Sequence, residues 1–347
     1  DLEYLSYENL FADESTPIDF TISPDLIASS YIKKLIKYQG TKQVFNFSSE
    51  ADCFINITFN EDNNTENTIQ YYQQACEKFN SKICAFIRND KLYSIEAGDT
   101  IEDGDELLFI CKEENIEDIT KLFGHNKNNR RIMIAGGGNI GKHLSENIRE
   151  SYQVKVIESN EERAEYLSEI LDNVTIINAD SSNEDILLEE NIEHMDVFCA
   201  LTNDDEANIL SAMLAKKLGS KTVISIINKI SYSDLLEKQE IDITVSPEDL
   251  TMGALLTHVR KGSVLKVHSL MRGNLELLEL EVRDKENSKT IGKNLEQINT
   301  PENTIMCCII RDEIIIFDMT NILLEKSDRL VCLVNKKDVK QIEELFE

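Results

Sequence analysis

The pattern of hydrophobic and polar positions is most regular between about 130 and 227. Short apolar runs alternate there with stretches in which apolar residues recur every three or four positions. The runs predict buried strands, and the stretches predict amphipathic helices. This alternation is typical of βαβ units and a parallel sheet. We expect strands near 131–135, 153–158, 174–179, 196–202 and 221–227, and helices near 140–149, 161–171, 184–190 and 205–217.

On both sides of this region the chain reads as a strand-rich module that ends in an amphipathic helix. The two modules span 42–124 and 264–347, and a helix is expected ahead of each. The Ser-Pro pairs at 23–24 and 246–247 mark the helix starts, because serine is a good N-cap and proline suits the first helical position. Glycines then end both helices.

The chain also repeats itself at one large offset. Three separate matches with almost no slippage indicate the duplication of a large unit, not a short solenoid repeat. The matches, all 223 residues apart, are Ile18–Pro24 with Ile241–Pro247, Glu102–Leu107 with Glu325–Leu330, and Leu122-Phe123 with Leu345-Phe346.

The offset predicts a domain layout. The first counterpart of the unit that starts near Arg130 would lie upstream of Asp1, so we expect about 93 further residues there, holding another dinucleotide-type domain. The expected fold class is α/β, with a Rossmann-like parallel-sheet domain flanked by two copies of a small α+β module. The expected divisions are 1–38 (tail of a first nucleotide domain and linker helix), 39–126 (first module), 127–246 (second nucleotide domain), 247–263 (linker helix) and 264–347 (second module).

Charge and composition narrow the possible partners. The 347 residues include 36 basic and 64 acidic side chains, which gives a net charge of −28. Binding along a nucleic-acid backbone needs clustered Lys and Arg, so we expect no nucleic-acid partner. No apolar run approaches the roughly 20 residues of a membrane span. The eight cysteines form no C-x-x-C pair, which favours buried reduced thiols in a cytosolic protein.

One motif carries candidate chemistry. The run from Arg131 to Gly141 is a short strand, a turn with G-x-G-x-x-G spacing and a helix start. Gly136 suits the tight turn, Gly138 lets backbone approach a pyrophosphate, and Gly141 lets helix and strand pack closely. The free N–H groups of the helix would face the phosphates, so the candidate ligand-binding loop comprises Gly136, Gly137, Gly138, Asn139, Ile140 and Gly141.

An acid at the end of the second strand supports this interpretation. Glu158 lies 22 residues after Gly136, about where an acidic side chain binds a ribose 2′-hydroxyl. The alternative interpretation is that Glu158 is an ordinary solvated residue at a strand end. Because a carboxylate repels a 2′-phosphate, the motif favours NAD(H) or an adenine nucleotide over NADP(H).

Three more residues follow later strands. Asp180 ends the third strand on the expected adenine side of the cleft, and it is equally able to N-cap the next helix. Thr202 and Asn203 follow the fourth strand and offer hydrogen bonds near the pyrophosphate and ribose. The acids after them suit a helix N-terminus, but acids beside a pyrophosphate need neutralising. Arg163 is expected at a solvated helix position, with a place beside the adenine as the alternative.

No catalytic arrangement is apparent. His143 reads as a surface residue, and neither His258 nor His268 has an obvious orienting carboxylate. The sequence contains no nucleophile elbow and no P-loop lysine. A dehydrogenase would need an acid or base from a substrate domain, whereas a second copy of the small module follows the glycine loop.

The motifs resemble a known family. The stretches IMIAGGGNIGKHL (132–144), CALTNDDEANILSAMLAKKLG (199–219) and SPEDLTMGALLTHVRKG (246–262) are similar to the TrkA-type regulatory subunits of bacterial Trk potassium uptake systems. That family has two regulator-of-potassium-conductance (RCK) units, each followed by a small C-terminal domain. The likeness spans essentially the whole chain, although the first nucleotide domain is not in this sequence.

The resemblance implies a gating protein without catalysis. Such proteins bind NAD(H) or ATP/ADP, form dimers or tetramers, and dock on the cytoplasmic face of a potassium-translocating membrane subunit of the TrkH or TrkG type. By position, the loop Gly136–Gly141 would hold the pyrophosphate and Glu158 the ribose, with Asp180 beside the adenine. Thr202 and Asn203 would close the cleft. An NAD-dependent oxidoreductase and an assembly protein with a vestigial cleft are the alternatives.

Overall fold

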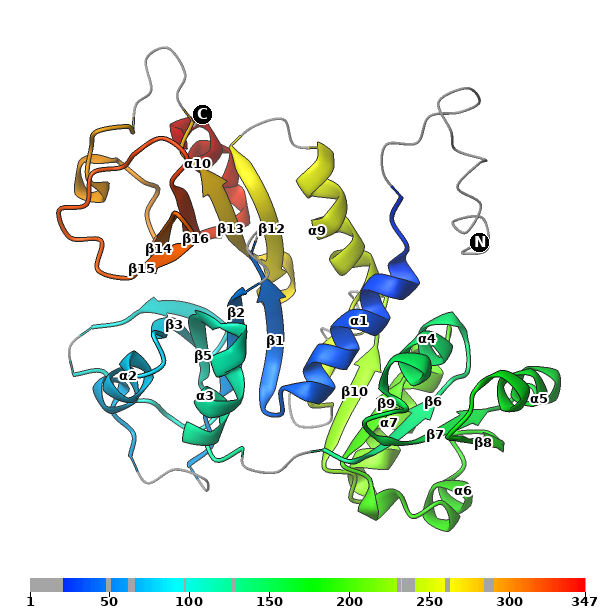
Figure 1. Cartoon of the computed structure of the whole chain (residues 1–347). Coiled ribbons are helices and arrows are strands. Elements are labelled where there is room, and N and C mark those ends of the chain that lie inside the picture. Colours follow the sequence, from blue (N-terminus) through cyan, green and yellow to red (C-terminus); the bar gives the residue numbers. More distant parts are fainter. Residues whose placement is uncertain are drawn as a thin grey trace, which may run out of the picture.

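The computed structural model describes residues 21–47, 51–61, 66–96, 98–125, 129–229, 232, 241–259, 263–283 and 290–346. Three sheets lie within these residues (Figure 1). Residues 1–20 of the expected tail lie outside them, and with them the start of the repeated stretch Ile18–Pro24, as do 260–262 of the expected linker helix.

The middle of the chain forms a parallel sheet, as predicted. Its strand order is β11-β10-β9-β6-β7-β8. The order reverses at β6, which pairs with β7 on one side and β9 on the other, and ligands of open α/β sheets bind at such a switch point. The strands are β6 (Arg131–Ala135), β7 (Gln153–Glu158), β8 (Val174–Asn178), β9 (Val197–Ala200), β10 (Thr222–Ile226) and β11 (Ile243–Val245).

The helices of this domain also lie where the periodicity predicts them. The only described strand of this sheet that the alternation did not predict is β11, which has three residues and therefore too short an apolar run. The helices are α4 (Asn139–Ile148), α5 (Glu161–Ile170), α6 (Glu184–Glu189) and α7 (Asp205–Lys217).

Each flanking module contains an antiparallel five-stranded sheet with the same topology. The orders are β1-β2-β5-β3-β4 and β12-β13-β16-β14-β15. The first module has β1 (Thr41–Asn46), β2 (Asp52–Thr58), α2 (Ile69–Glu77), β3 (Lys82–Arg88), β4 (Lys91–Ser94), β5 (Glu106–Lys112) and α3 (Ile116–Leu122). The second has β12 (Val264–Leu270), β13 (Leu275–Glu281), β14 (Ile305–Arg311), β15 (Ile314–Ile316), β16 (Arg329–Asn335) and α10 (Val339–Phe346). The expected α/β fold with two flanking modules is confirmed.

The 223-residue offset holds down to irregularities of the backbone. Bulges interrupt β1 between Thr41 and Gln43 and β12 between Val264 and Lys266. A second pair of bulges lies at equivalent places in β3 and β14. A bulge re-aims the side chains that follow it, so both copies direct the same positions into their cores.

The repeated acidic turn has a structural cause. Asp105 accepts two hydrogen bonds from the guanidinium of Arg88, at 2.9 and 2.6 Å, and its carboxylate also accepts the backbone N–H of Glu102. In the second copy, Asp328 is bound in the same way by Arg311. Each aspartate therefore fastens the turn before one strand to the end of another.

The two modules share one hydrophobic core. Alternate residues of each sheet point to opposite faces. One face of the first sheet carries Phe54, Leu108 and Ile110, which cluster with Leu277 and Leu333 of the second sheet. The opposite face of each sheet packs on its own helices. The modules therefore stack face to face, as their adjacent positions in Figure 1 show.

Helix α1 (Pro24–Lys37) connects the first module to the parallel domain. It packs along α4 and beside its counterpart α9 (Pro247–Val259), and it contacts β1 (Figure 1). Ser29 and Ile32 of α1 are fully buried, whereas the equivalent Met252 and Leu255 of α9 are 49% and 42% exposed. The two linker helices are thus equivalent in sequence but not in surroundings.

The buried aspartate pairs give a stability prediction. Asp105 is 2% exposed, so Asp105→Asn should lower the free energy of unfolding by about 1–2 kcal/mol. This loss of stability is smaller than that expected for a fully buried ion pair, because the Arg88 side chain is 24% exposed. Urea unfolding would measure it. The control is Asp118→Asn, since Asp118 and Lys121 form an exposed pair that should contribute nothing measurable. Equal effects of the two changes would contradict this role.

Candidate functional site

The glycine loop has the geometry that its spacing predicts. Gly136 has φ +106°, a conformation that favours glycine, and its N–H donates to Ile157 O. A Cβ on Gly141 would lie 2.0 Å from Gly136 O, so only glycine lets the helix approach the strand this closely. A Cβ on Gly138 would meet no described atom within 4 Å, so this position borders open space.

Glu158 is fixed by the loop that it faces. One carboxylate oxygen accepts the N–H of Gly137 at 2.8 Å, and the other accepts the N–H of Asn160 at 2.8 Å. The carboxylate therefore lies against the glycine turn at the carboxyl end of β7. Each oxygen has a second lone pair with which it can accept a hydroxyl from a ligand.

Arg163 is not at the solvated position expected for it. Its Nε donates to Gly137 O at 2.8 Å, and its guanidinium lies over the ring of Tyr166 at 5.2 Å from the centroid. The side chain folds back over the loop from the first turn of α5.

Thr202 is oriented by Asn208, a residue that no motif in the sequence marks. Its hydroxyl donates to Asn208 Oδ1 at 2.7 Å, and its N–H donates to the same oxygen at 2.8 Å. The amide of Asn208 donates in turn to Thr202 O and to Ile226 O. Asn208 is fully buried and ties the ends of β9 and β10 together beside the glycine loop.

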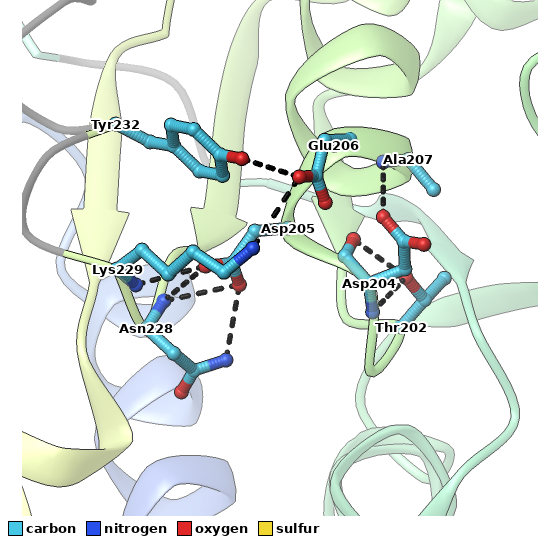
Figure 2. A network of polar contacts seen from close by, with 8 residues as sticks. All are labelled: Thr202, Asp204, Asp205, Glu206, Ala207, Asn228, Lys229 and Tyr232. Carbon is cyan, nitrogen blue, oxygen red and sulfur yellow. Dashed lines mark hydrogen bonds and ion pairs between the residues drawn. The ribbon is translucent and has the colours of Figure 1, made fainter.

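The three acids at the start of α7 all have local partners (Figure 2). Asp204 caps the helix by accepting the N–H of Ala207 at 2.9 Å. Buried Asp205 accepts the backbone N–H groups of Asn228 and Lys229. Glu206 accepts a hydrogen bond from Tyr232, which, with Lys229, lowers the pKa of this carboxyl to about 2. Backbone N–H groups thus bind Asp204 and Asp205, and Lys229 forms an ion pair with Glu206 at 3.4 Å.

Asp180 does not cap the next helix. Asn183 is the N-cap of α6, and its side chain accepts the N–H of Asp185. Asp180 instead accepts two hydrogen bonds from the backbone and hydroxyl of Ser182, which lower its pKa. The carboxylate is held in a turn at the end of β8, with one oxygen in these bonds. Its role beside an adenine stays a prediction.

A cavity of about 160 Å³ lies at the glycine loop. Several predicted residues line it, and so does one from outside the parallel domain. The lining residues are Asp25, Gly138, Asn139, Ile140, Arg163, Leu201 and Asn203. Glu158 and Asp180 do not line it, so a dinucleotide placed as predicted would extend beyond this cavity.

Other reactive groups of the described chain lie away from this cavity. His143 contacts Glu146 on the surface of α4. The ring of His268 stacks on that of Phe45, while the side chain of His258 lies outside the described residues. All eight cysteines are buried, as expected. Among the described residues no cluster of three or more His, Cys, Asp or Glu is arranged for a metal ion, and no helix is long and apolar enough to cross a membrane.

Comparison with known proteins agrees with this architecture. The model of the TrkA-N domain matches residues 132–247. The Trk system potassium uptake protein TrkA of Halomonas elongata is 36% identical over 99% of this chain and 76% of its own length. The TrkA of Vibrio alginolyticus is 37% identical over the same shares. The crystal structure of the GsuK RCK domain superposes with a TM-score of 0.52. The match covers 94% of this chain and 70% of the GsuK chain, at 15% sequence identity.

The fold is therefore similar to that of the GsuK RCK domain, with a glycine-loop α/β domain joined to two small α+β modules. At 36–37% identity over nearly all its length, the chain belongs to the TrkA family of Trk system potassium uptake proteins. The chain spans about three quarters of the length of these two relatives.

The glycines give a prediction that separates folding from ligand binding. Gly138 has φ −62°, which alanine adopts without strain, and a Cβ there would meet no described atom. Gly138→Ala should therefore leave the thermal unfolding midpoint nearly unchanged while weakening nucleotide binding at least about tenfold, by about 1.4 kcal/mol.

Gly141→Ala is the contrasting change. Its Cβ would clash with Gly136 O, so this variant should lose both stability and binding. Scanning calorimetry and titration calorimetry on the two variants would check the pair. Unchanged affinity in a folded Gly138→Ala protein would mean that ligands do not approach this face of the loop.

Proposed function

We propose that this chain is the cytoplasmic regulatory subunit of a potassium uptake transporter, peripheral to the inner face of the plasma membrane, and is not an enzyme. It couples the binding of NAD(H) or ATP/ADP to potassium flux through a membrane subunit of the TrkH or TrkG type. The observation that carries this proposal is an intact glycine loop in a member of the TrkA family.

The chemistry of the loop supports an adenine dinucleotide or nucleotide. The first turn of α4 presents backbone N–H groups and the positive end of the helix dipole to a phosphate. Glu158 offers acceptors for ribose hydroxyls at the carboxyl end of β7. A carboxylate at this place disfavours a 2′-phosphate, which supports NAD(H) over NADP(H).

The cavity lining supports binding rather than catalysis. It offers one guanidinium, one carboxylate and one amide pair, and its described residues include no histidine, cysteine or lysine. Arg163 cannot serve as a general base, because a guanidinium stays protonated in proteins. An oxidoreductase would need a proton donor or acceptor beside the nicotinamide, and the one carboxylate of the described lining, Asp25, accepts a hydrogen bond from Asn139.

The arrangement of domains supports a conformational output. We propose the division into 1–38, 39–126, 127–246, 247–263 and 264–347, with the modules acting as regulatory C-terminal domains in a homodimer or tetramer. A ligand shifts such an assembly only by binding one arrangement better than another. Helix α1 connects the glycine loop to the first module and is the route for this shift.

Glu158 provides the direct test. Glu158→Gln keeps the size of the side chain but replaces a charged acceptor, so NADH affinity should fall about tenfold or more. The preference against NADPH should shrink, because the repelling charge is gone. Titration calorimetry would measure both affinities, with Glu162→Gln on the exposed face of α5 as the control.

A flux assay connects binding to function. In vesicles containing the membrane subunit, Glu158→Gln should need a correspondingly higher NADH concentration for the same change in potassium flux. If neither NADH nor ATP binds the wild-type protein, or if the variant regulates flux like wild type, the proposal is wrong.

A further inference from the structure

A carboxylate from outside the parallel domain faces the glycine loop. Asp25 belongs to the first turn of α1, and its Oδ2 accepts a hydrogen bond from Asn139 Nδ2 at 3.0 Å. The two residues are 114 positions apart in sequence. Asp25 also lines the cavity with Gly138 and Arg163. Of the described residues that line the cavity, Asp25 alone comes from an element beyond the α/β domain.

The position of Asp25 sets up a competition. Asn139 and Gly138 form the start of α4, where an anion is attracted by the helix dipole and by free N–H groups. A ligand phosphate would bind at the same N-terminus of α4. Two anions confined to one small cavity repel each other, and this repulsion grows with the charge on the phosphates.

The volume of the cavity adds a steric reason. At about 160 Å³ it has room for only part of a dinucleotide or a nucleoside triphosphate. The other lining residues belong to the loops and helices around β6, β7 and β9, which pair in one continuous sheet. Movement of α1 away from α4 is therefore the change that enlarges the cavity without disrupting the sheet.

We propose that Asp25 is a specificity-determining residue that grades ligands by phosphate charge, and that a bound phosphate displaces it together with α1. This inference rests on the proposed nucleotide-binding function. ATP carries more phosphate charge than ADP, and ADP more than NADH. Asp25 therefore penalises ATP most and NADH least, and ATP displaces α1 furthest.

Displacement of Asp25 with α1 would change the packing of α1 on the first module. The ring of Tyr31 in α1 stacks on that of Phe45 in β1, with centroids 5.6 Å apart. Ile32, Leu35 and Ile36 of the same helix are buried in the core that includes that module. Because interior packing is tight, α1 cannot shift without moving or repacking these contacts.

The repeat supplies a matched control. Glu248 is the counterpart of Asp25 at the 223-residue offset and also lies in the first turn of its helix, α9. Its side chain is exposed and does not line the cavity. Asp25→Asn and Glu248→Gln therefore remove the same charge from equivalent helix positions, with only one at the loop.

The test is titration calorimetry on the whole chain with NADH, ADP and ATP, in EDTA so that no divalent cation screens the phosphates. Asp25→Asn keeps an oxygen that can accept the hydrogen bond from Asn139. It should tighten ATP binding by about tenfold, ADP by less and NADH by about twofold, while Glu248→Gln changes none of them. ATP affinity of the variant should also depend less on salt.

The outcomes separate the two proposals. If wild-type protein binds none of the three ligands, the proposed function fails and this inference with it. If it binds them and Asp25→Asn changes all three equally, or weakens them, the charge-grading role is wrong while the proposed function stands. Asp25→Ser, which also lacks the charge, should rank the ligands as Asp25→Asn does, and a different ranking would overturn the inference.

Hydrogen exchange tests the displacement. Saturating ATP should speed exchange of the α1 amides in the wild-type protein and do so less in Asp25→Asn, because the amide is not repelled. Equal exchange in α1 with and without ATP in the wild-type protein would contradict the movement of this helix.

Discussion

The face-to-face packing of the two antiparallel sheets is the interaction on which the arrangement depends. Equivalent residues meet across it: the Phe45 ring stacks on that of His268, its counterpart, with centroids 4.3 Å apart. Cys84 and Cys307, another equivalent pair, both lie in this core, and each thiol donates to the carbonyl two residues before it. Burial lowers the pKa of His268 to about 3, so its ring stays neutral and the shared core carries no charge there. This packing fixes the first module, and the first module carries α1 to the glycine loop.

The two modules keep the same backbone while their buried polar contacts have changed. In the first module Asn56 of β2 donates to Glu106 of β5 at 2.9 Å. The equivalent residues of the second are Glu279 and Arg329, which form an ion pair at 3.3 Å. The acidic side chain is on β5 in the first module and on β13 in the second. Each pair of strands still has a donor facing an acceptor. Asp105 and Asp328, in contrast, kept one role because the turn that they fasten is the same in both copies.

Local patterns predicted much of this molecule. The strands and helices between 131 and 217 follow from periodicity, and the roles of Gly136 and Gly141 in shaping the turn follow from spacing. Arg163 was misjudged because its partner is a backbone carbonyl, which no residue pattern marks. Asp25 was missed for a different reason. Its contact with Asn139 joins segments 114 positions apart, and that proximity exists only once α1 has packed on α4.

The shared core also constrains how the protein is made. Phe54, Leu108 and Ile110 reach the interior only when β13 and β16 are made, and even the shortest of these separations, Ile110 to Leu275, is 165 residues. Domains generally fold as they emerge from the ribosome, N-terminal ones first. The first module must therefore wait with an apolar sheet face uncovered while the whole α/β domain is synthesised. Translation speed and chaperone access therefore affect the yield of folded protein. The chain stays prone to aggregation until its second module covers the apolar sheet face of the first.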